Sequence, residues 1–319
     1  MNRKKRKTAV QISIAVVLIA ALLVLLLPGR RIFVSTAVTI NVLIPNGDWR
    51  PLERFTSAPT WHDIATQTAD GQDIVVRIYE PSNTAEETPA QFGLVIYTPL
   101  IAAGLDDERL MNLASSWARA GIPVAIPWSD NGLAIQVRDI EEIVAAAQQL
   151  QTQTNITKLV LFGISYGNGP TFHAAIDERL ANSLAAIISL NGMYDLASVV
   201  EFIDSGQSHE YGREVVAATR AAGIDLADVR DRLSPATALN QITVPVYSIH
   251  STADQFIPHT QSTQLHQSLL SQHKESTLVL TDVIEHGTYR PLTPTNFFTR
   301  YIPAGWGLTR ISYALLALR

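Results

Sequence analysis

The sequence predicts an α/β protein in which helices cover both faces of a mostly parallel β-sheet. Six short apolar runs recur along the chain, and stretches with a helical pattern lie between most of them. The runs are continuously apolar rather than alternating, which is typical of parallel strands that are buried on both faces. With 319 residues, of which 47% are hydrophobic, the chain is long enough to enclose a substantial core.

The expected strands and helices follow one another along the chain. The six apolar runs cover residues 93–97, 122–127, 159–162, 184–190, 244–249 and 277–281. The helical patterns cover residues 107–120, 136–153, 168–182 and 261–272. Before them, residues 61–68 and 73–79 flank a turn centred on Asp70 and predict a hairpin. We therefore expect one domain over residues 61–319.

One connection, between Asp195 and Gln241, is too long to be a simple crossover. Residues 196–204 and 210–233 have helical patterns and would lie over the end of the sheet where ligands bind in such folds. We expect a small helical cap insertion at about residues 196–240. The pattern alone does not distinguish a lid that gates a site from an enlarged connection.

A candidate nucleophile lies where the third apolar run ends. The segment Gly163-Ile-Ser-Tyr-Gly167 has the pattern G-x-S-x-G, in which a serine is exposed on a sharp turn between a strand and a helix. The pattern can arise by chance, but here it follows an apolar run and precedes a helical pattern with Pro170 in its first turn. Glycine is needed on both sides because a Cβ would clash where strand and helix approach each other. Ser165 is therefore the predicted nucleophile.

With these motifs the chain resembles the α/β-hydrolase family over roughly residues 61–290. The segment 233–258 is similar to the family's seventh strand and the acidic residue after it, which gives Asp254 that role. The segment 278–287 is similar to the eighth strand with its histidine loop, which points to His286. The order Ser, Asp, His along the chain is that of the family. The resemblance implies an α/β-hydrolase fold with a catalytic triad, in which the imidazole accepts the serine proton and the carboxylate orients the imidazole.

Each of these assignments has a competitor. Asp195, just after the fourth apolar run, is the alternative acid, while Asp282 lies too close to the histidine in sequence to approach it from another strand end. His250 and His259 flank the predicted acid and are the alternative bases. His286 is favoured because a base must come from a separate loop that faces the serine.

The predicted oxyanion hole differs from that of many relatives. They carry His-Gly after the third strand, whereas here Tyr97 is followed by Thr98-Pro99-Leu100. Pro99 has no N–H, so the resemblance implies the backbone N–H groups of Leu100 and Tyr166 as the two donors. Loss of one such donor costs about 3–4 kcal/mol of transition-state stabilisation, so the placement of Leu100 bears directly on the rate.

These residues predict a serine hydrolase that transfers an acyl group to water through an acyl-serine intermediate. A carboxylic ester is the first choice of substrate, followed by a peptide or amide, and no metal or organic cofactor is expected. The sequence has no cysteine, which excludes thiolate catalysis and Cys-ligated zinc. The alternative is a catalytically silent α/β-hydrolase domain that binds a partner or ligand at the membrane surface. The complete triad argues against this alternative, and the absent His-Gly argues for it.

The N-terminus has the pattern of a membrane anchor. Residues 2–7 form a basic cluster, residues 8–27 contain no charge, and Arg30 and Arg31 follow. About 20 helical residues cross the roughly 30 Å hydrocarbon core of a bilayer. We expect residues 1–31 to be a cytoplasmic tail and an uncleaved transmembrane signal anchor rather than a cleaved signal, whose apolar region is shorter. The excess of basic residues before the span places the N-terminus in the cytoplasm and the domain outside.

The remaining stretches are less informative. Residues 32–60 are interpreted as a linker, although residues 34–44 fit either a strand or a helix. Residues 308–318 predict a last helix that packs on the sheet, with a second membrane contact as the less favoured interpretation.

Without the seven basic residues of the N-terminal segment, 17 Lys and Arg stand against 29 Asp and Glu, a net charge of −12. Such a domain is not expected to bind nucleic acid.

Overall fold

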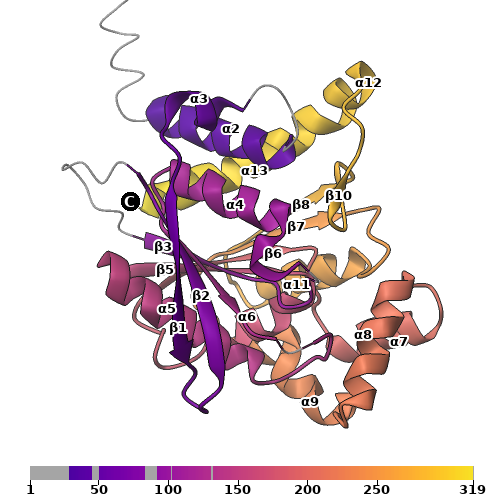
Figure 1. Ribbon diagram of the computed structural model, residues 1–319. Coiled ribbons are helices and arrows are strands. Elements are labelled where there is room, and N and C mark those ends of the chain that lie inside the picture. The colour runs from indigo at the N-terminus through magenta and orange to yellow at the C-terminus, as the bar shows by residue number, and fades with distance from the viewer. Residues whose placement is uncertain (1–28, 45–49, 83–91, 102, 131, 319) are drawn as a thin grey trace, which may run out of the picture.

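An eight-stranded sheet crosses the part of the chain that the computed structural model describes, which is residues 29–44, 50–82, 92–101, 103–130 and 132–318 (Figure 1). The strands are β1 (Thr60–Gln67), β2 (Asp73–Glu80), β3 (Phe92–Tyr97), β4 (Val124–Trp128), β5 (Lys158–Ile164), β6 (Leu184–Leu190), β7 (Val246–Ser251) and β8 (Ser276–Thr281). Their order in the sheet is β1-β2-β4-β3-β5-β6-β7-β8. β1 and β2 are antiparallel to their neighbours, whereas β3 to β8 run parallel, which confirms the predicted mostly parallel sheet.

Every predicted strand is present, and its ends differ from the prediction by only one or two residues. β4 begins at Val124 rather than at residue 122, because Pro123 has no N–H to contribute to the ladder. The carbonyl of Pro123 instead accepts the N–H of Leu94. A small second hairpin, β9 (Ile284–Glu285) and β10 (Thr288–Tyr289), was not expected from the sequence.

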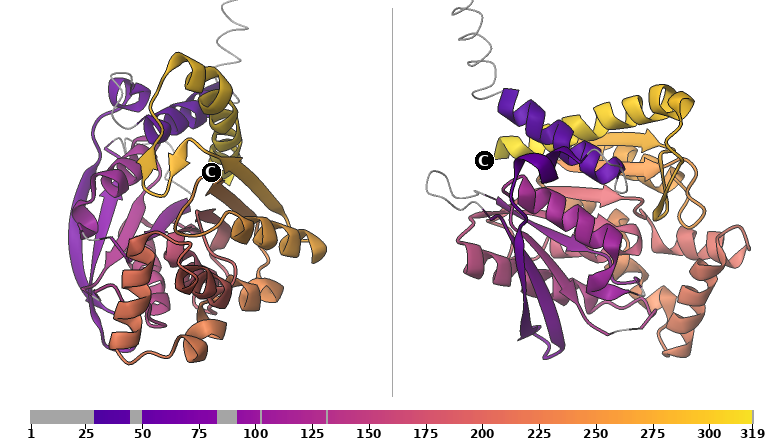
Figure 2. Two further views of the ribbon diagram at one scale, coloured as in Figure 1. Left: turned by 90° about the vertical axis from the view of Figure 1, so that its right-hand side faces the viewer. Right: turned by 45° about the horizontal axis from the view of Figure 1, so that its top comes forward.

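Helices cover both faces of the sheet (Figure 2). Each face encloses its own cluster of buried hydrophobic side chains. The helices on one face are α2 (Arg30–Leu43), α4 (Glu108–Arg119) and α13 (Ile302–Leu315). Those on the other face are α5 (Asp139–Thr154), α6 (Asn168–Ala174) and α11 (Thr260–Ser271). Short helices α3 (Pro51–Phe55), α10 (Pro235–Ala238) and α12 (Pro294–Asn296) lie in the connections. The predicted helices are therefore confirmed, and the last of them, α13, packs on the sheet as expected.

One predicted helix is shorter than its pattern suggests. The pattern over residues 168–182 becomes a helix only as far as Ala174. Beyond it, the side chain of Asp177 accepts the backbone N–H of Arg179 at 2.9 Å, and Leu180 donates to the carbonyl of Asp177 at 3.0 Å. Such local bonds compete with helical bonding, and they turn the chain toward β6.

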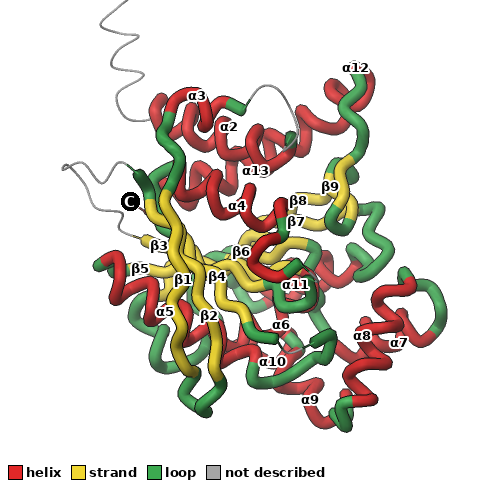
Figure 3. Tube along the Cα trace, viewed as in Figure 1, coloured by secondary structure: helices red, strands yellow, loops and turns green. Residues whose placement is uncertain are grey.

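Three of the helices between β6 and β7 lie in the stretch where the cap insertion was expected (Figure 3). They are α7 (Leu196–Asp204), α8 (Glu210–Ala221) and α9 (Leu226–Leu233). The pattern over residues 210–233 is divided at Gly223, whose φ of +74° ends α8, and Asp225 then caps α9. The apolar sides of the cap helices form a third buried cluster together with Tyr166 and Ile257. The cap therefore packs against the loops at the carboxyl ends of the strands.

The interpretation of residues 32–60 as a linker is corrected for the part that the structure describes, which belongs to the packed domain, while residues 45–49 lie outside the described ranges. Residues 30–43 form α2, which lies beside α13, and the hydroxyl of Thr309 donates to that of Thr39 at 3.2 Å. The side chain of Leu43 is only 3% exposed. The many β-branched residues favoured a strand, but apolar residues three and four positions apart give the segment one helical face that α13 buries.

No helix in the described ranges is long and apolar enough to cross a bilayer. The predicted span over residues 8–27 lies outside those ranges, as does most of the expected cytoplasmic tail and anchor over residues 1–31.

The burial of α2 predicts a stability effect that a linker would not show. Leu43→Ala should lower the free energy of unfolding by about 2–5 kcal/mol, because it removes buried methyl groups and leaves a cavity. Ile32→Ala on the same helix is the matched control, since Ile32 is 53% exposed and its loss should cost little. Chemical denaturation of both variants measures the difference, and equal small effects would contradict the packing of α2.

Candidate active site

Ser165 lies on the sharp turn that the G-x-S-x-G pattern predicts. β5 ends at Ile164, Ser165 has a φ of +56°, and α6 starts at Asn168. A Cβ on Gly163 would lie 2.7 Å from the Cα of Asn168, and one on Gly167 would lie 2.5 Å from the carbonyl oxygen of Tyr97. Both positions therefore require glycine. The positive φ of a non-glycine residue is a strained conformation that the packed turn maintains.

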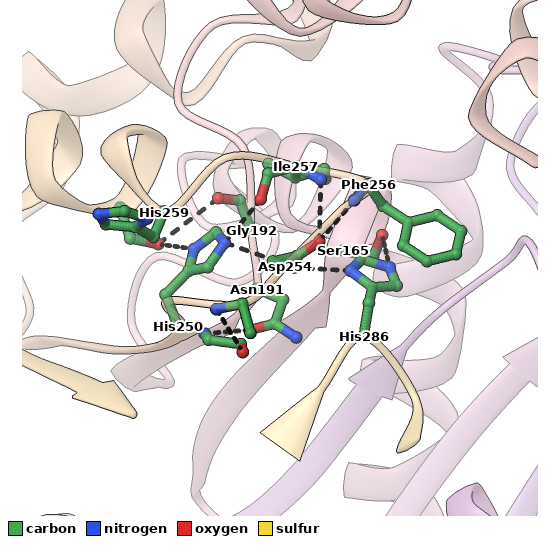
Figure 4. Close-up of polar contacts among 12 residues, drawn as sticks. Ser165, Asn191, Gly192, His250, Asp254, Phe256, Ile257, His259 and His286 are labelled. Atoms are coloured by element: carbon green, nitrogen blue, oxygen red, sulfur yellow. Dashed lines mark hydrogen bonds and ion pairs between the residues drawn. The ribbon is translucent and has the colours of Figure 1, made fainter. Parts of the chain in front are cut away.

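The structure brings Ser165, His286 and Asp254 together in one line of hydrogen bonds (Figure 4). Ser165 Oγ is 2.9 Å from His286 Nε2, and His286 Nδ1 is 2.7 Å from Asp254 Oδ2. Asp254 follows β7, and His286 lies on the loop between β9 and β10, so three separate strand ends supply the three side chains. With Nδ1–H donating to the carboxylate, Nε2 is free to accept the serine proton.

Asp254 is held on both of its oxygens. Oδ1 accepts the backbone N–H groups of Phe256 at 2.7 Å and Ile257 at 3.0 Å, while His250 Nε2 lies 3.5 Å from Oδ2. Burial by itself raises the pKa of Asp254, but the hydrogen bonds from His250 and His286, the charge of His286 and the N–H of Ile257 outweigh it. The pKa of this carboxyl is therefore held well below its usual range, and Asp254 is ionised at neutral pH.

The competing acids and bases have other partners. Asp195 caps α7 by accepting the N–H of Ser198 at 2.8 Å and pairs with Arg230. Asp282 pairs with arginines on the surface. His250 is fully buried between Ser262 and the carbonyl of Ile257, and His259 stands at the start of α11. None of these four reaches Ser165 through a hydrogen bond in the described part of the chain.

Sequence reasoning missed a stack of rings against the histidine. The ring of Phe256 stacks on His286 with centroids 4.3 Å apart, and His209 from the cap stacks on the other face of Phe256 at 4.6 Å. The backbone N–H of His209 also donates to the carbonyl of Gln255 at 2.9 Å. Phe256 lies two residues after Asp254, so its position near the site could have been inferred from the sequence. Nothing in the sequence indicated that His209 of the cap would stack on it.

Leu100 and Tyr166, the predicted oxyanion donors, both line the cavity at Ser165. The hydroxyl of Tyr211, in the cap helix α8, donates to the carbonyl of Leu100 at 2.8 Å and fixes this loop. The hydroxyl of Tyr166 donates to Asp139 Oδ2 at 2.9 Å beneath the turn. Burial and the neighbouring charge of Glu142 raise the pKa of Asp139 well above its usual value. These contacts hold the side chain of Tyr166 in place behind the serine.

A cavity of about 640 Å³ opens at Ser165 and His286, and its walls are mostly hydrophobic. Its size is within the range of small-molecule sites. Within the described residues, no three His, Asp or Glu side chains cluster in a way that could hold a metal ion. The site places a hydroxyl, an imidazole and a carboxylate beside an apolar cavity.

Comparisons with known proteins identify a family and solved structures that the chain resembles. The model of the prolyl oligopeptidase family matches residues 129–299. No curated protein matches the chain. Among solved structures, a puromycin-hydrolysing peptidase of Mycobacterium tuberculosis aligns with a TM-score of 0.58 and 16% identity, over 82% of this chain and 39% of that one. An acylaminoacyl peptidase of Pyrococcus horikoshii aligns with a TM-score of 0.58 and 17% identity, over 83% of this chain and 42% of that one.

A bacterial brefeldin A esterase is closer in size. It aligns with a TM-score of 0.61 and 14% identity, over 90% of this chain and 86% of that one. The chain thus spans about two-fifths of the length of the two peptidases and most of the length of the esterase. At these identities the likeness shows the fold alone, and it confirms the α/β-hydrolase fold that the sequence predicted.

The lowered pKa of Asp254 predicts how stability changes in acid. Because this pKa is lower in the folded than in the unfolded protein, the ionised carboxyl stabilises the fold above about pH 4, and the contribution is lost as the pH falls below that value. In Asp254→Asn, the free energy of unfolding should therefore fall less steeply between about pH 5 and about pH 3. Urea unfolding at several pH values measures the slope. Asp228→Asn, which removes an exposed carboxylate, controls for the loss of one charge, and a wild-type slope in Asp254→Asn would refute the prediction.

Proposed function

The chain belongs to the prolyl oligopeptidase family, whose members are serine hydrolases, and on this premise we propose that Ser165, His286 and Asp254 are its catalytic triad. The observation that carries the proposal is the pair of hydrogen bonds of 2.9 Å and 2.7 Å that joins the three side chains. A serine hydroxyl becomes a competent nucleophile when an oriented imidazole can accept its proton.

The reaction proceeds in two half-reactions. Ser165 Oγ attacks the carbonyl carbon of the substrate while His286 Nε2 takes the hydroxyl proton, and the same nitrogen then protonates the leaving group as the C–O or C–N bond breaks. Water next gives a proton to Nε2 and attacks the acyl-serine. As the bond between the acyl carbon and Ser165 Oγ breaks, Nε2 returns the proton to Oγ, which releases the acid and restores the serine. Asp254 keeps its negative charge throughout and stabilises the imidazolium.

The oxyanion that forms in each half-reaction needs two donors. We assign the backbone N–H groups of Leu100 and Tyr166 to this role, because both residues line the cavity at Ser165. The hydroxyl of Tyr211 holds the carbonyl of Leu100, and Asp139 holds the hydroxyl of Tyr166, so both donor residues are fixed by other side chains. This would allow the Thr98-Pro99-Leu100 loop to replace the usual His-Gly.

The substrate that we propose is a carboxylic ester, with a peptide or amide as the second choice. The solved structures of similar fold include both an esterase and peptidases, so the fold accommodates either leaving group. The ester comes first because the cavity is mostly apolar, whereas the N–H and C=O groups of a buried peptide need hydrogen-bond partners. The alternative is a catalytically silent binding domain, and the following experiment distinguishes it from an enzyme.

Substitutions in the triad should separate catalysis from folding. Ser165→Ala and His286→Ala should each abolish labelling by a fluorophosphonate and hydrolysis of a short-chain ester, because nucleophile and base act as one unit. Asp254→Asn should lose about 10⁴ in kcat, since the amide favours the wrong imidazole tautomer. His259→Ala and Asp195→Asn are the controls and should remain active. A wild-type protein that is folded by circular dichroism but accepts neither probe nor ester would leave the silent domain in place of the enzyme.

We also propose that residues 8–27 anchor the protein in a membrane, with its N-terminus in the cytoplasm and the hydrolase domain on the other side. The uncharged stretch and its basic flank support the anchor. Apolar side chains that are exposed on the layer of α2 and α13 also support a position of this layer close to a bilayer. Phe298, Ile302 and Trp306 recur every four residues, with Trp306 69% exposed, and Phe33 meets Phe55 edge-on at 5.7 Å. Aromatic and aliphatic side chains of this kind favour the interface of a membrane.

The anchor has a direct test in intact cells. The full chain should remain with the membrane after washing at alkaline pH, and protease added outside should digest the domain. A chain that lacks residues 2–27 should be released, and it serves as the control. Release of the full chain by the wash, or a mature N-terminus beyond Arg31, would refute the anchor.

A further inference from the structure

The cavity at Ser165 does not end at the catalytic residues. It continues beneath the helical layer on the α2, α4 and α13 face of the sheet. The inner walls carry Val38 and Val42 from α2, Leu113 from α4, and Leu308 and Ile311 from α13. Helices far apart in the sequence thus enclose one apolar space that opens at the nucleophile.

The floor of this inner part is the sheet itself. Phe162, Ile188 and Ile249 line it from the neighbouring strands β5, β6 and β7. Phe162 is paired in register with Ile188, so the floor is a continuous apolar surface that begins three residues before Ser165. A ligand group that enters from the serine therefore meets hydrocarbon below it and above it.

Polar groups along the walls are largely engaged with the protein. The hydroxyl of Thr39 donates to the carbonyl of Ser35 at 2.9 Å, and the amide of Asn112 donates to the carbonyl of Asn41 at 3.1 Å. Near the opening, Arg109 pairs with Asp107 and donates to the carbonyl of Gly287 at 3.1 Å. A peptide in the inner part would leave its backbone groups short of partners, whereas an aliphatic chain needs none.

We propose that this inner part of the cavity is a binding site for the aliphatic acyl chain of the substrate, which makes the preferred substrate a carboxylic ester of a medium- or long-chain fatty acid. The inference rests on the proposed function, because the chain is placed by its carbonyl carbon at Ser165. The acyl chain extends beneath α2 and α13, and the alcohol leaves on the side of the cap.

A series of acyl esters tests the chain-length preference. With p-nitrophenyl esters from acetate to dodecanoate, kept below the concentrations at which they aggregate, kcat/KM should rise by up to about fourfold for each added methylene until the site is full. The gain follows from the hydrophobic transfer of each methylene out of water. A series of alkyl acetates, which lengthens the alcohol instead, should show a much weaker trend.

Substitutions at Val38 change the volume of the proposed acyl site. Val38→Phe should shift the best substrate to shorter chains, and Val38→Ala should shift it to longer chains. Val34→Phe is the matched control, because Val34 lies one turn earlier on α2 and packs on the core without lining the cavity. It should keep the wild-type chain-length profile.

Binding without turnover gives an independent measurement. Dodecanoate should raise the Tm of Ser165→Ala, and Val38→Phe in the same background should reduce the shift, because a ligand that binds only the folded state stabilises it. Acetate hydrolysis with a flat chain-length profile and no Tm shift would overturn the acyl site while the triad stands. A stronger dependence on the alcohol chain than on the acyl chain would overturn it as well. Loss of all ester hydrolysis and probe labelling, with the Tm shift kept, would instead refute the proposed catalysis.

Discussion

The geometry of the candidate active site depends on the placement of one buried carboxylate. Asp254 is desolvated, and it remains ionised because two backbone N–H groups and two histidines surround it. Its Oδ1 orders the chain as far as Ile257, and its Oδ2 orients His286 toward the serine. Phe256, within that ordered segment, then covers one face of the His286 ring. The negative charge of Asp254 thus determines the conformation of the loop after β7 and the orientation of the His286 ring. Through Phe256 it also determines the contact with His209 of the cap.

The sequence was a good guide wherever local chemistry decides the structure. The apolar runs predicted the strands because a parallel strand buried on both faces has to be continuously hydrophobic. The glycines at 163 and 167 predicted the turn of Ser165 because any Cβ there would meet backbone atoms. Ser165 was predicted from its motif, and Asp254 and His286 from the resemblance to the α/β-hydrolase family. The structure brings the three side chains together because each follows a strand and their strand ends lie near one another.

Features that depend on tertiary packing were beyond the sequence. The apolar spacing of residues 34–44 allowed a helix and their β-branched content allowed a strand equally well, and the packing of α13, about 270 residues later, decides for the helix. The stacking of His209 on Phe256 and the bond from Tyr211 to Leu100 join the cap to two loops that are distant in the chain. His250 looked like a competing base, but burial beside Asp254 makes it a second partner of the acid.

The layer formed by α2 and α13 has two different surfaces. The inner surfaces of α2 and α13 enclose the apolar cavity, while their outer surfaces expose Phe33 and Trp306. When Arg30 and Arg31 of α2 are counted with the domain, 19 Lys and Arg stand against 29 Asp and Glu, a net charge of −10 that does not favour anionic headgroups. Hydrophobic contact and the proposed anchor are the forces that would hold this layer at a bilayer. An ester with a long acyl chain resides in that bilayer. With the proposed anchor holding this layer at the bilayer, such a chain would reach Ser165 along the inner surfaces of α2 and α13, and the acyl site would be the end of that route.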